Sequence, residues 1–585
     1  MAPLTEGHNA SIAEFVPELD RLAADVMADW KVPGAALAVV QDGKVALAKA
    51  YGQRDVDANL PVTATTQFLI CSITKSFTAT GVALLHNQRR LDWTKPVRDY
   101  IPEFRLHDPV ATERVTVQDL LCHQSGLPRH DWVHFPGDRS AAELLGVMRY
   151  LELSRDIRAA WQYNNLCYNV AGLLIERLSG QSYEAFTRTR LTDRLGMKVS
   201  FTLDDLEASA DAARPYMMHE DTRLPALRLP IRTIAGGAIN SSVADIASWM
   251  RLHLGKEFDG DRLLPAALIS ELHAPRIYNT TPGHAEFGEA HYGLGFQSNS
   301  YRGDRLVFHG GGWVGWGTLM TLVPEFGIGV AVFTNRSPSE VPATLTWYII
   351  DRLRGRDPVD WRERFRKQRE EFIAHLHVDK DAKEKARHKD THPAHQLADY
   401  AGDYEHPAYG VMSITEQGGA LHWSWRGMFA TMVHRHYETF ELPEVPDRLL
   451  PDKLTITFLT NRDGSIVSLW APLEAMVKDI VFVRLAAGDC TLAAFRERCV
   501  GSFKGGATTH RVTLDTEGQL VLKPDNQPAY RLVPQEGRRF RIVELEGFFV
   551  EFRGEATIID ELIFHQPNGT FVATRVDDSA DAKVG

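Results

Sequence analysis

Apolar and polar residues recur in the first part of the chain at spacings that predict a helix followed by a hairpin. Residues 12–30 place apolar groups at helical intervals. The apolar runs 35–40 and 44–50 flank Asp42-Gly43, a dipeptide that favours a tight turn between two strands. We therefore expect a helix and then two paired antiparallel strands.

The rest of the first 355 residues predicts a helical middle and a second group of strands. Several helix-like segments lie between residues 139 and 270. The runs 306–309, 318–323 and 328–334 are typical of strands, and a helix is expected at about 339–355. Strands near both ends with helices between them indicate the α+β class. The sheet would be antiparallel, built from both ends, with the helical middle on one side.

Residues 362–393 are rich in charged side chains and separate the first 355 residues from a C-terminal part of different character. We expect the first half of this stretch to be helical and the second half to be a solvated linker. Its histidines match no helical pair or finger spacing, so a metal cluster is not indicated here.

Beyond the charged stretch, short strands and turns form a diverged internal repeat. Residues 397–423 parallel residues 495–522, and each copy spans about ninety residues. Repeats of this kind favour two small antiparallel barrels, because closure removes exposed strand edges. The predicted division places the α+β domain at 1–375, a charged linker at 376–394, a first barrel at 395–488 and a second barrel at 489–585.

Composition and charge narrow the class of partner. The 585 residues carry a net charge of −11, which argues against nucleic acid or an anionic membrane as the main partner. No apolar run approaches the length of a membrane span, and the N-terminus does not resemble a signal peptide. The five scattered cysteines suggest neither a disulfide framework nor a zinc site. We expect a cytoplasmic protein.

Ser72 and Lys75 form the sole Ser-x-x-Lys of the sequence, at the start of a predicted helix. Positions i and i+3 share a helix face, so the lysine can lie beside the serine hydroxyl. A serine needs a neighbouring base to become a nucleophile, and a lysine that loses its proton can supply it. Cys71 precedes Ser72, and we interpret it as a small buried residue rather than a thiol nucleophile.

Two further segments carry chemistry. Tyr163 and Asn165 lie in a loop that enters the predicted helix 166–178, where their side chains can face a cleft. His309 and three glycines follow an apolar strand, where the absence of side chains lets a substrate backbone approach the strand edge. The backbone N–H of Gly312 could face that of Ser72 across an oxyanion.

Three motifs in this order, Ser-x-x-Lys, Tyr-x-Asn and His-x-Gly, resemble the superfamily of serine β-lactamases, penicillin-binding proteins and D-aminopeptidases. The resemblance covers residues 12–355 and implies a β-lactamase-like domain. The two repeats are similar to the lipocalin-like barrels of three-domain D-aminopeptidases. This resemblance implies that at least one barrel borders the active site.

The resemblance also implies roles for the first motif and for the tyrosine. Ser72 would be the acylated nucleophile. Lys75 would be its base, or would relay the proton through Tyr163, and these two alternatives stay open. The Tyr163 hydroxyl, near two cations, is expected to have a lowered pKa.

Further roles follow from the same resemblance. Asn165 would orient Lys75 and bind a substrate carbonyl, Gly311 would line the substrate, and His309 would support Tyr163 and the leaving group. The N–H groups of Ser72 and Gly312 would form the oxyanion hole. Histidine at 309, where β-lactamases carry lysine, offers no permanent charge for a substrate carboxylate. That difference favours an amidase, an esterase or a D-aminopeptidase-like enzyme.

The leading hypothesis is a serine hydrolase that forms an acyl-enzyme on Ser72 and cleaves peptide amide bonds. An esterase or weak β-lactamase of the same fold is one alternative. A non-catalytic penicillin-recognising or ligand-binding protein is another. We expect a small-molecule or short-peptide substrate, no cofactor, no metal, no nucleic acid, no membrane and a possible homo-oligomer.

Overall fold

The computed structural model describes residues 10–219, 222–231, 233–257, 263–280, 283–443, 454–486, 488–516, 518–545, 547–554 and 559–576. The ends of the expected terminal domains, 1–9 and 577–585, lie outside these residues.

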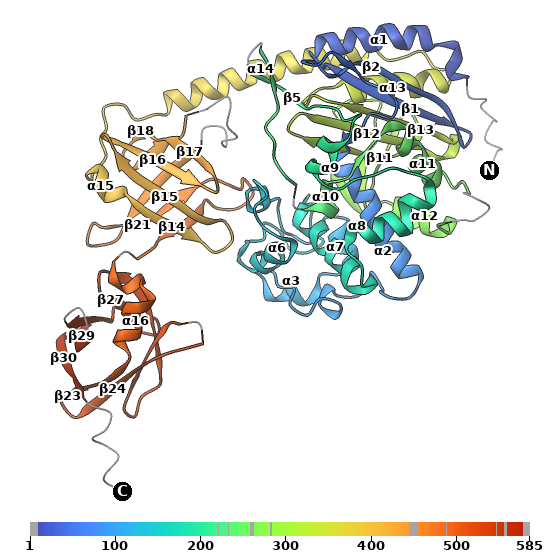
Figure 1. Ribbon diagram of the computed structural model, residues 1–585. Coiled ribbons are helices and arrows are strands. Elements are labelled where there is room, and N and C mark those ends of the chain that lie inside the picture. Colours follow the sequence, from blue (N-terminus) through green and yellow to red (C-terminus); the bar gives the residue numbers. More distant parts are fainter. Residues whose placement is uncertain are drawn as a thin grey trace.

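A twisted sheet of nine described strands forms the centre of the first domain, and its two termini supply neighbouring strands (Figure 1). Across the sheet the strands run in the order β3 (Leu60–Pro61), β2 (Lys44–Asp55), β1 (Gly34–Gln41), β13 (Ile328–Thr334), β12 (Trp316–Val323), β11 (Asp304–Trp313), β10 (Gln297–Tyr301), β9 (Ala290–Tyr292) and β8 (Ile277–Thr280). The expected hairpin at Asp42-Gly43 and the antiparallel pairing of the two ends of the domain are confirmed, since β1 pairs with both β2 and β13.

Helices cover both faces of this sheet, and β1 shows why its sequence is apolar throughout. Ala35, Leu37 and Val39 belong to the core beneath α1 (Val16–Asp29) and α13 (Val341–Leu353). The alternate residues, including Ala36 and Ala38, belong to a second core on the opposite face. Because successive side chains of a strand point to opposite faces, a doubly covered strand must be apolar at every position.

The second core holds the helical middle of the domain, as expected from the sequence. Its longer helices are α2 (Thr74–Asn87), α7 (Asn165–Ser179) and α11 (Val243–His253). Shorter helices connect them: α3 (Pro109–Arg114), α4 (Val117–Leu121), α5 (Asp131–His134), α6 (Ala141–Val147), α8 (Tyr183–Thr187), α9 (Leu203–Ala208), α10 (Ile234–Gly237) and α12 (Ala266–His273). Two small two-stranded sheets complete the domain, β4 (Phe68–Leu69) with β7 (Asn240–Ser241) and β5 (Tyr216–His219) with β6 (Thr222–Pro225).

A long helix, α14 (Trp361–Lys385), runs from the first domain toward the first barrel (Figure 1). It continues ten residues into the segment 376–394 that we expected to be a linker, so the expectation of a non-helical second half was wrong for these residues. The stretch contains no glycine or proline, and Arg366 pairs with Glu363 and Glu370 one helical turn away on either side. Such pairs stabilise a solvated helix.

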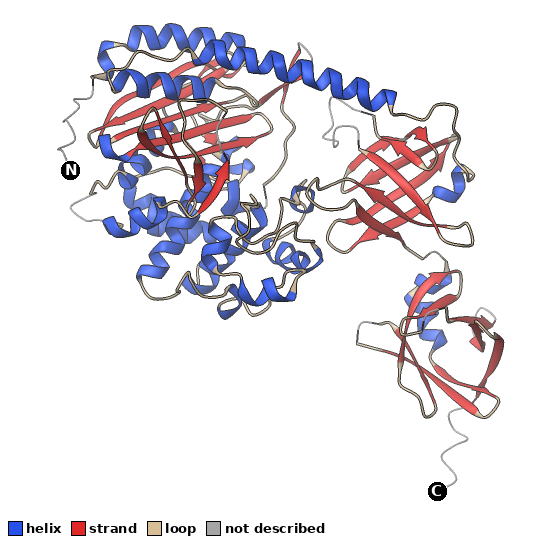
Figure 2. Cartoon of the chain, turned by 180° about the vertical axis from the view of Figure 1, so that it is seen from behind, coloured by secondary structure: helices blue, strands red, loops and turns tan. Residues whose placement is uncertain are grey.

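Two antiparallel barrels follow, as the repeat predicted; the first is nearly closed and the second is closed (Figure 2). The first contains β14 (Gly402–His406), β15 (Gly410–Gln417), β16 (Ala420–Trp425), β17 (Met428–Thr431), β18 (Val433–His436), β19 (Thr439–Glu441), β20 (Thr455–Thr460), β21 (Ile466–Ala471) and β22 (Ile480–Arg484). The second contains β23 (Gly501–Gly505), β24 (Thr508–Leu514), β25 (Leu520–Pro524), β26 (Tyr530–Glu536), β27 (Arg539–Ile542), β28 (Phe549–Gly554), β29 (Ile559–Gln566) and β30 (Gly569–Val576). A short helix precedes each barrel, α15 (Leu397–Tyr400) and α16 (Ala493–Cys499), so the repeat extends beyond the strands.

The first barrel shares an apolar core with the first domain, whereas the second barrel does not. Buried residues of the first barrel belong to the same continuous core as the helical middle of the first domain. The second barrel has its own core, formed by residues from Cys490 onward. In both views the first barrel lies between the first domain and the second barrel (Figures 1 and 2). No helix among the described residues is long and apolar enough to cross a membrane.

Candidate active site

Ser72 lies in a single turn of 3-10 helix, Cys71–Ile73, that leads directly into α2. The predicted helix start at this motif is therefore confirmed. Cys71 has a φ of 51°, in the left-handed region that residues other than glycine seldom occupy. Its side chain is buried, and burial raises the pKa of the thiol, which keeps it protonated. Cys71 is thus a packing residue, as interpreted from the sequence.

Lys75 is fully buried and its Nζ atom lies within hydrogen-bonding distance of three oxygen atoms. These are Ser72 Oγ at 3.1 Å, Asn165 Oδ1 at 2.8 Å and the Gly236 carbonyl oxygen at 2.6 Å. Both Asn165 Oδ1 and the Gly236 carbonyl accept hydrogen bonds only. A neutral amine donates two hydrogens and keeps one lone pair. If the two acceptors take the hydrogens, the lone pair remains for the Ser72 hydroxyl.

The pKa of Lys75 is held well below its usual value. Burial is the largest cause, and the nearby Arg129 guanidinium lowers the pKa further, while Asp131 opposes both effects. A charged ammonium loses hydration when it is buried, so the neutral form is favoured. The site therefore supplies a buried amine whose neutral form is favoured.

Tyr163 donates a hydrogen bond from its hydroxyl to Ser72 Oγ, at 2.8 Å. Burial raises the pKa of this hydroxyl, and this effect outweighs the lowering by the Ser72 hydrogen bond and by Arg129. Our expectation of a lowered pKa for Tyr163 was wrong, because it weighed the neighbouring cations and ignored desolvation of the phenolate. Tyr163 is consequently a proton donor in the resting site.

Asn165 is the first residue of α7, and Asn164 before it caps the helix by accepting the N–H of Cys167. The Asn165 amide connects Lys75 to a carboxylate: its oxygen accepts from Lys75, and its Nδ2 donates to Asp131 Oδ1 at 3.3 Å. The carboxylate therefore fixes which end of the amide faces the lysine. The expected role of Asn165 in orienting Lys75 matches this contact.

His309 lies on β11 and is buried against Tyr292 rather than hydrogen-bonded to Tyr163. Its Nδ1 is 2.6 Å from the Gly310 carbonyl oxygen and must donate to it, so Nε2 accepts from the Tyr292 hydroxyl at 2.8 Å. The ring centres of His309 and Tyr163 are 6.5 Å apart. Burial and the nearby Lys75 lower the pKa of His309 to about 3, so the imidazole is neutral at pH 7.

The two glycines of the third motif face different surroundings. A methyl group at Gly311 would lie 2.5 Å from the Ile70 carbonyl oxygen and 2.8 Å from Cys71 Cβ. Glycine at 311 thus lets β11 approach the Ser72 segment. A methyl group at Gly312 would meet nothing within 4 Å, so this position opens toward free space.

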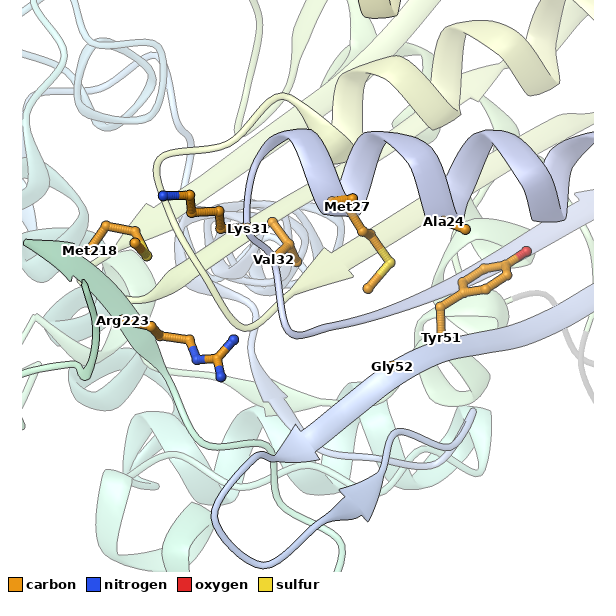
Figure 3. Close-up of a pocket in the computed structure, with 9 residues that line it drawn as sticks. Ala24, Met27, Lys31, Val32, Tyr51, Gly52, Met218 and Arg223 are labelled. Carbon is orange, nitrogen blue, oxygen red and sulfur yellow. The ribbon is translucent and has the colours of Figure 1, made fainter. Parts of the chain in front are cut away.

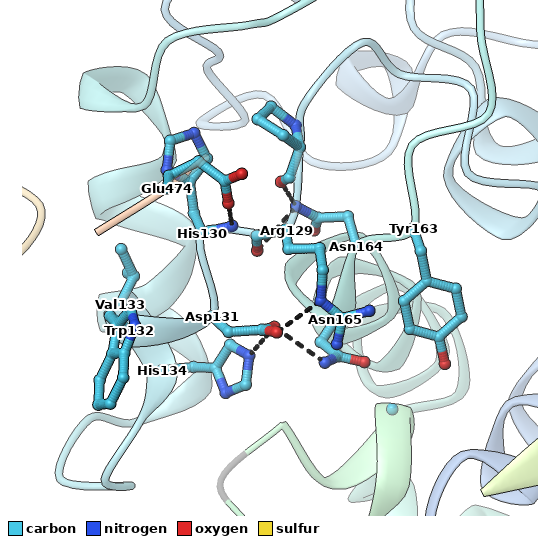
Figure 4. A network of polar contacts seen from close by, with 12 residues as sticks. Arg129, His130, Asp131, Trp132, Val133, His134, Tyr163, Asn164, Asn165 and Glu474 are labelled. Atoms are coloured by element: carbon cyan, nitrogen blue, oxygen red, sulfur yellow. Dashed lines mark hydrogen bonds and ion pairs between the residues drawn. The ribbon is translucent and has the colours of Figure 1, made fainter. Parts of the chain in front are cut away.

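Arg129 and Asp131 complete the network, and the sequence analysis did not identify them (Figure 4). Asp131 Oδ2 accepts from Arg129 Nε at 2.6 Å, and Asp131 Oδ1 accepts from His134 Nε2 at 3.0 Å. The Arg129 guanidinium also lies 5.0 Å from the centre of the Tyr163 ring. The sequence signal that could have identified them is a pair of opposite charges, Arg129 and Asp131, that follows the turn-forming segment Gly-Leu-Pro.

Two cavities differ in their place: one lies away from this network, and one includes the residue after Gly312. One of about 750 Å³ is lined by Met27, Tyr51 and Arg223, and by none of the residues above (Figure 3). Another of about 510 Å³ is lined in part by Trp313, which follows Gly312 on β11, and by Trp316. Among the described residues, no group of three or more His, Cys, Asp or Glu side chains is arranged to hold a metal ion.

Known proteins resemble this chain over most of its length. Residues 19–354 match the family model for β-lactamase, and residues 386–484 match a domain of unknown function, DUF3471. A protein named unguisins hydrolase from Aspergillus campestris is 31% identical over 414 residues, covering 66% of this chain and 75% of the relative. A second unguisins hydrolase, from Aspergillus violaceofuscus, is 28% identical and covers 72% of this chain and 79% of the relative.

The solved structure of an octameric penicillin-binding protein homologue from Pyrococcus abyssi shares the fold. It aligns with a TM-score of 0.53 at 24% identity and covers 80% of this chain and 99% of the homologue. The family model spans more than half of the 585 residues, and the Ser72, Lys75 and Tyr163 contacts lie inside the matched region. The chain therefore belongs to the β-lactamase family, whose fold it shares with the penicillin-binding proteins.

Proposed function

We propose that this protein is a serine hydrolase that forms an acyl-enzyme on Ser72 and cleaves amide bonds of short peptides. The observation that carries the proposal is the bonding of Lys75. Asn165 and Gly236 occupy two of its hydrogens and leave its third direction to Ser72 Oγ. This arrangement prepares the lysine to accept the serine proton.

In the proposed acylation, Ser72 Oγ attacks the substrate carbonyl carbon while its proton passes to Lys75 Nζ. The carbonyl oxygen becomes an oxyanion between the N–H groups of Ser72 and Gly312. Tyr163 then gives its hydroxyl proton to the leaving nitrogen, the C–N bond breaks, and Lys75 returns its proton to Tyr163. In the second half of the reaction, water attacks the acyl carbon while one of its protons passes through Tyr163 to Lys75. Lys75 then gives this proton to Ser72 Oγ as the bond between Oγ and the acyl carbon breaks and the acid leaves. Lys75 is thus the proposed base, and Tyr163 the proposed acid.

The proposed substrate class follows from the charge and shape near Gly312. His309 is neutral, so this position supplies no fixed cation for a substrate carboxylate such as that of a β-lactam. The cavity that Trp313 and Trp316 line in part begins one residue after Gly312 along β11, and its wall combines apolar side chains with charged ones such as Glu207 and Arg228. Relatives named as unguisins hydrolases also support a hydrolytic activity.

A labelling experiment tests the proposal. A fluorophosphonate probe should modify the protein once, on Ser72, as mapped by mass spectrometry, and Ser72→Ala should abolish both labelling and turnover. An adduct on another residue, or none, would contradict the mechanism. A panel of D- and L-amino acid anilides, p-nitrophenyl esters and a cephalosporin then identifies the bond type. Ester turnover with no measurable anilide turnover, at equal acyl group, would favour the esterase alternative.

Two further properties remain proposals. The five cysteines are all buried with free thiols, which suits a reducing compartment and a cytoplasmic location. The Pyrococcus abyssi homologue is described as octameric, and we propose that this chain also self-associates. Light scattering on the purified protein would measure the mass in solution.

A further inference from the structure

Two residues of the first barrel, Glu474 and Tyr409, form hydrogen bonds with the loop that carries Arg129 and Asp131. Neither of them belongs to the three sequence motifs. Glu474, which is buried, accepts the backbone N–H of His130 at 2.7 Å. The hydroxyl of Tyr409 lies 2.7 Å from His130 Nδ1. Both barrel residues therefore contact the residue that directly precedes Asp131, and Figure 4 shows Glu474 at His130.

The hydrogen bonds define the state of the His130 ring. Its Nε2 is 3.0 Å from the Glu152 carbonyl oxygen, which can only accept, so Nε2 carries a hydrogen. Burial lowers the pKa of His130, so the ring is neutral and Nδ1 must accept from the Tyr409 hydroxyl. Each polar atom of this buried side chain thus has one partner, and one of the two partners comes from the barrel.

The backbone at His130 needs such support. Its φ is 44°, in the left-handed region, where a residue with a side chain is strained. Conformations of this kind persist when surrounding contacts enforce them. The hydrogen bond from the His130 N–H to Glu474 fixes the peptide plane at this point, and so directs the next residue, Asp131, toward Asn165.

Further barrel contacts hold the short helix α5 that begins at Asp131. The Arg426 guanidinium donates to the carbonyl oxygens of Trp132 at 2.6 Å and Val133 at 3.0 Å. The ring centres of Trp425 and Trp132 are 5.9 Å apart. These contacts occupy the free carbonyls of the helix and bury one of its faces.

We propose that the first barrel is a positioning element for the reaction, and that Glu474 and Tyr409 hold His130 so that Asp131 orients the Asn165 amide toward Lys75. The inference rests on the proposed function, since it concerns the reactivity of Ser72. The connected contacts run from Glu474 to the His130 backbone, then through Asp131 and Asn165 to Lys75. No hydrogen bond of the described barrel residues reaches Ser72, Lys75 or Tyr163, so the barrel acts through this loop.

The test compares two glutamates of the same barrel. Glu438 also accepts two hydrogen bonds, from the backbone N–H of Ala394 at 2.9 Å and from the hydroxyl of Tyr400. Neither bond involves residues 129–139, the loop that carries Arg129 and Asp131. We expect Glu474→Ala to slow fluorophosphonate labelling of Ser72 and to lower kcat about tenfold or more, with a smaller change in KM. Glu438→Ala should change both rates less than about twofold at matched thermal stability.

Coupling separates positioning from general destabilisation. If Glu474 acts through Asp131, the combination of Glu474→Ala with Asp131→Asn should slow labelling little more than the slower single variant. Glu474→Gln keeps an acceptor for the His130 N–H and should recover most of the rate. Where Glu474→Ala fails to fold, Tyr409→Phe removes one hydroxyl alone and should slow labelling in the same direction.

The outcomes distinguish the two proposals. Equal labelling rates in wild type, Glu474→Ala and Tyr409→Phe would overturn the positioning role and leave the serine hydrolase intact. Fully multiplicative effects of Glu474→Ala and Asp131→Asn would also overturn it. Absence of Ser72 labelling in the wild-type protein would instead overturn the proposed function, and the positioning role with it.

Discussion

At the residue scale, Lys75 shows how opposing neighbours set the pKa of one buried amine. Arg129 lowers this pKa and Asp131 raises it, while burial dominates both. A base must be unprotonated, so activity falls as the pH drops through the pKa of Lys75 in the free enzyme. The acid limb of the pH profile therefore reports this residue.

Arg129→Gln removes a cation that disfavours protonation of Lys75, so the pKa of Lys75 should rise. The acid limb of kcat/KM should consequently move to higher pH. Asp131→Asn removes an anion and should move the same limb to lower pH, whatever its effect on the plateau rate. Labelling rates of Ser72 from about pH 5 to about pH 10 measure both shifts. If the acid limb of the pH profile stays at the wild-type pH in both variants, Lys75 is not the titrating base.

Alanine substitutions at Gly311 and Gly312 allow the unfolding free energy to be compared between a crowded and an open position. Gly311→Ala places a methyl group 2.5 Å from the Ile70 carbonyl oxygen, so β11 must move from the Ser72 segment. Overpacking of this kind costs about 1–3 kcal/mol of unfolding free energy. Gly312→Ala adds a methyl group in open space and should leave the unfolding free energy within about 0.5 kcal/mol of wild type. Denaturant titration compares them, and equal losses would contradict the packing described at 311.

The sequence predicted the residues that meet at Ser72 but not the loop that supports them. Lys75 and Asn165 belong to spaced motifs, and Lys75 contacts both Ser72 and Asn165. Asp131 carries no such motif, because its position depends on a barrel more than 270 residues further along the chain. The pKa of Tyr163 was misjudged for a related reason: residue spacing reveals nearby charges and does not reveal complete burial.

At the element scale, α2 is a helix whose polar side chains are buried with their partners. Ser76 Oγ donates to the Ile73 carbonyl oxygen and accepts from Trp249 Nε1 at 2.9 Å. Trp249 also stacks on Phe77, with ring centres 3.7 Å apart. A helix that is buried on all sides needs such internal partners, because water cannot supply them.

Ser76→Ala should lower the unfolding free energy by about 1–3 kcal/mol, because it leaves the buried Trp249 N–H without an acceptor. Adding Trp249→Phe removes that orphaned donor, so the double variant should lose less than the sum of the two single losses. Thermal or denaturant unfolding measures the cycle. Simple additivity would show that the Ser76–Trp249 bond contributes nothing of its own.

The sequence predicted most strands and helices of the first domain but misplaced the end of α14. Apolar runs and turn residues identified β1, β2 and β13, because these strands bury both faces or end in glycine turns. The residues 376–385 have exposed side chains, apart from Lys380, whose side chain is not described, so no apolar periodicity marks them as helical. Their structure rests on helix-forming residues and continuation of an existing helix, which a search for an apolar face does not detect.

At the scale of the whole molecule, the two barrels relate differently to the active site. The first shares a core with the helical middle, whereas the second is built around its own core. Truncation after residue 486 should therefore leave Ser72 labelling within about twofold of the full-length rate. Truncation after Lys385 removes the partners of Trp132 and His130, and should slow labelling or yield insoluble protein. Reduced labelling in the first truncation would assign the second barrel a part in the reaction.

The attachment of the first barrel at two places has a consequence for association. The long helix α14 leads the chain to the barrel, and Arg387 just beyond it donates to the carbonyl oxygens of Arg435 and His434. Docking on the 129–139 loop is thus an intramolecular event with an effective concentration on the order of millimolar. Individually weak contacts can then keep the loop occupied in a very dilute protein. A cut in the exposed segment after residue 387 would turn docking into a bimolecular step, and Ser72 reactivity would come to depend on dilution.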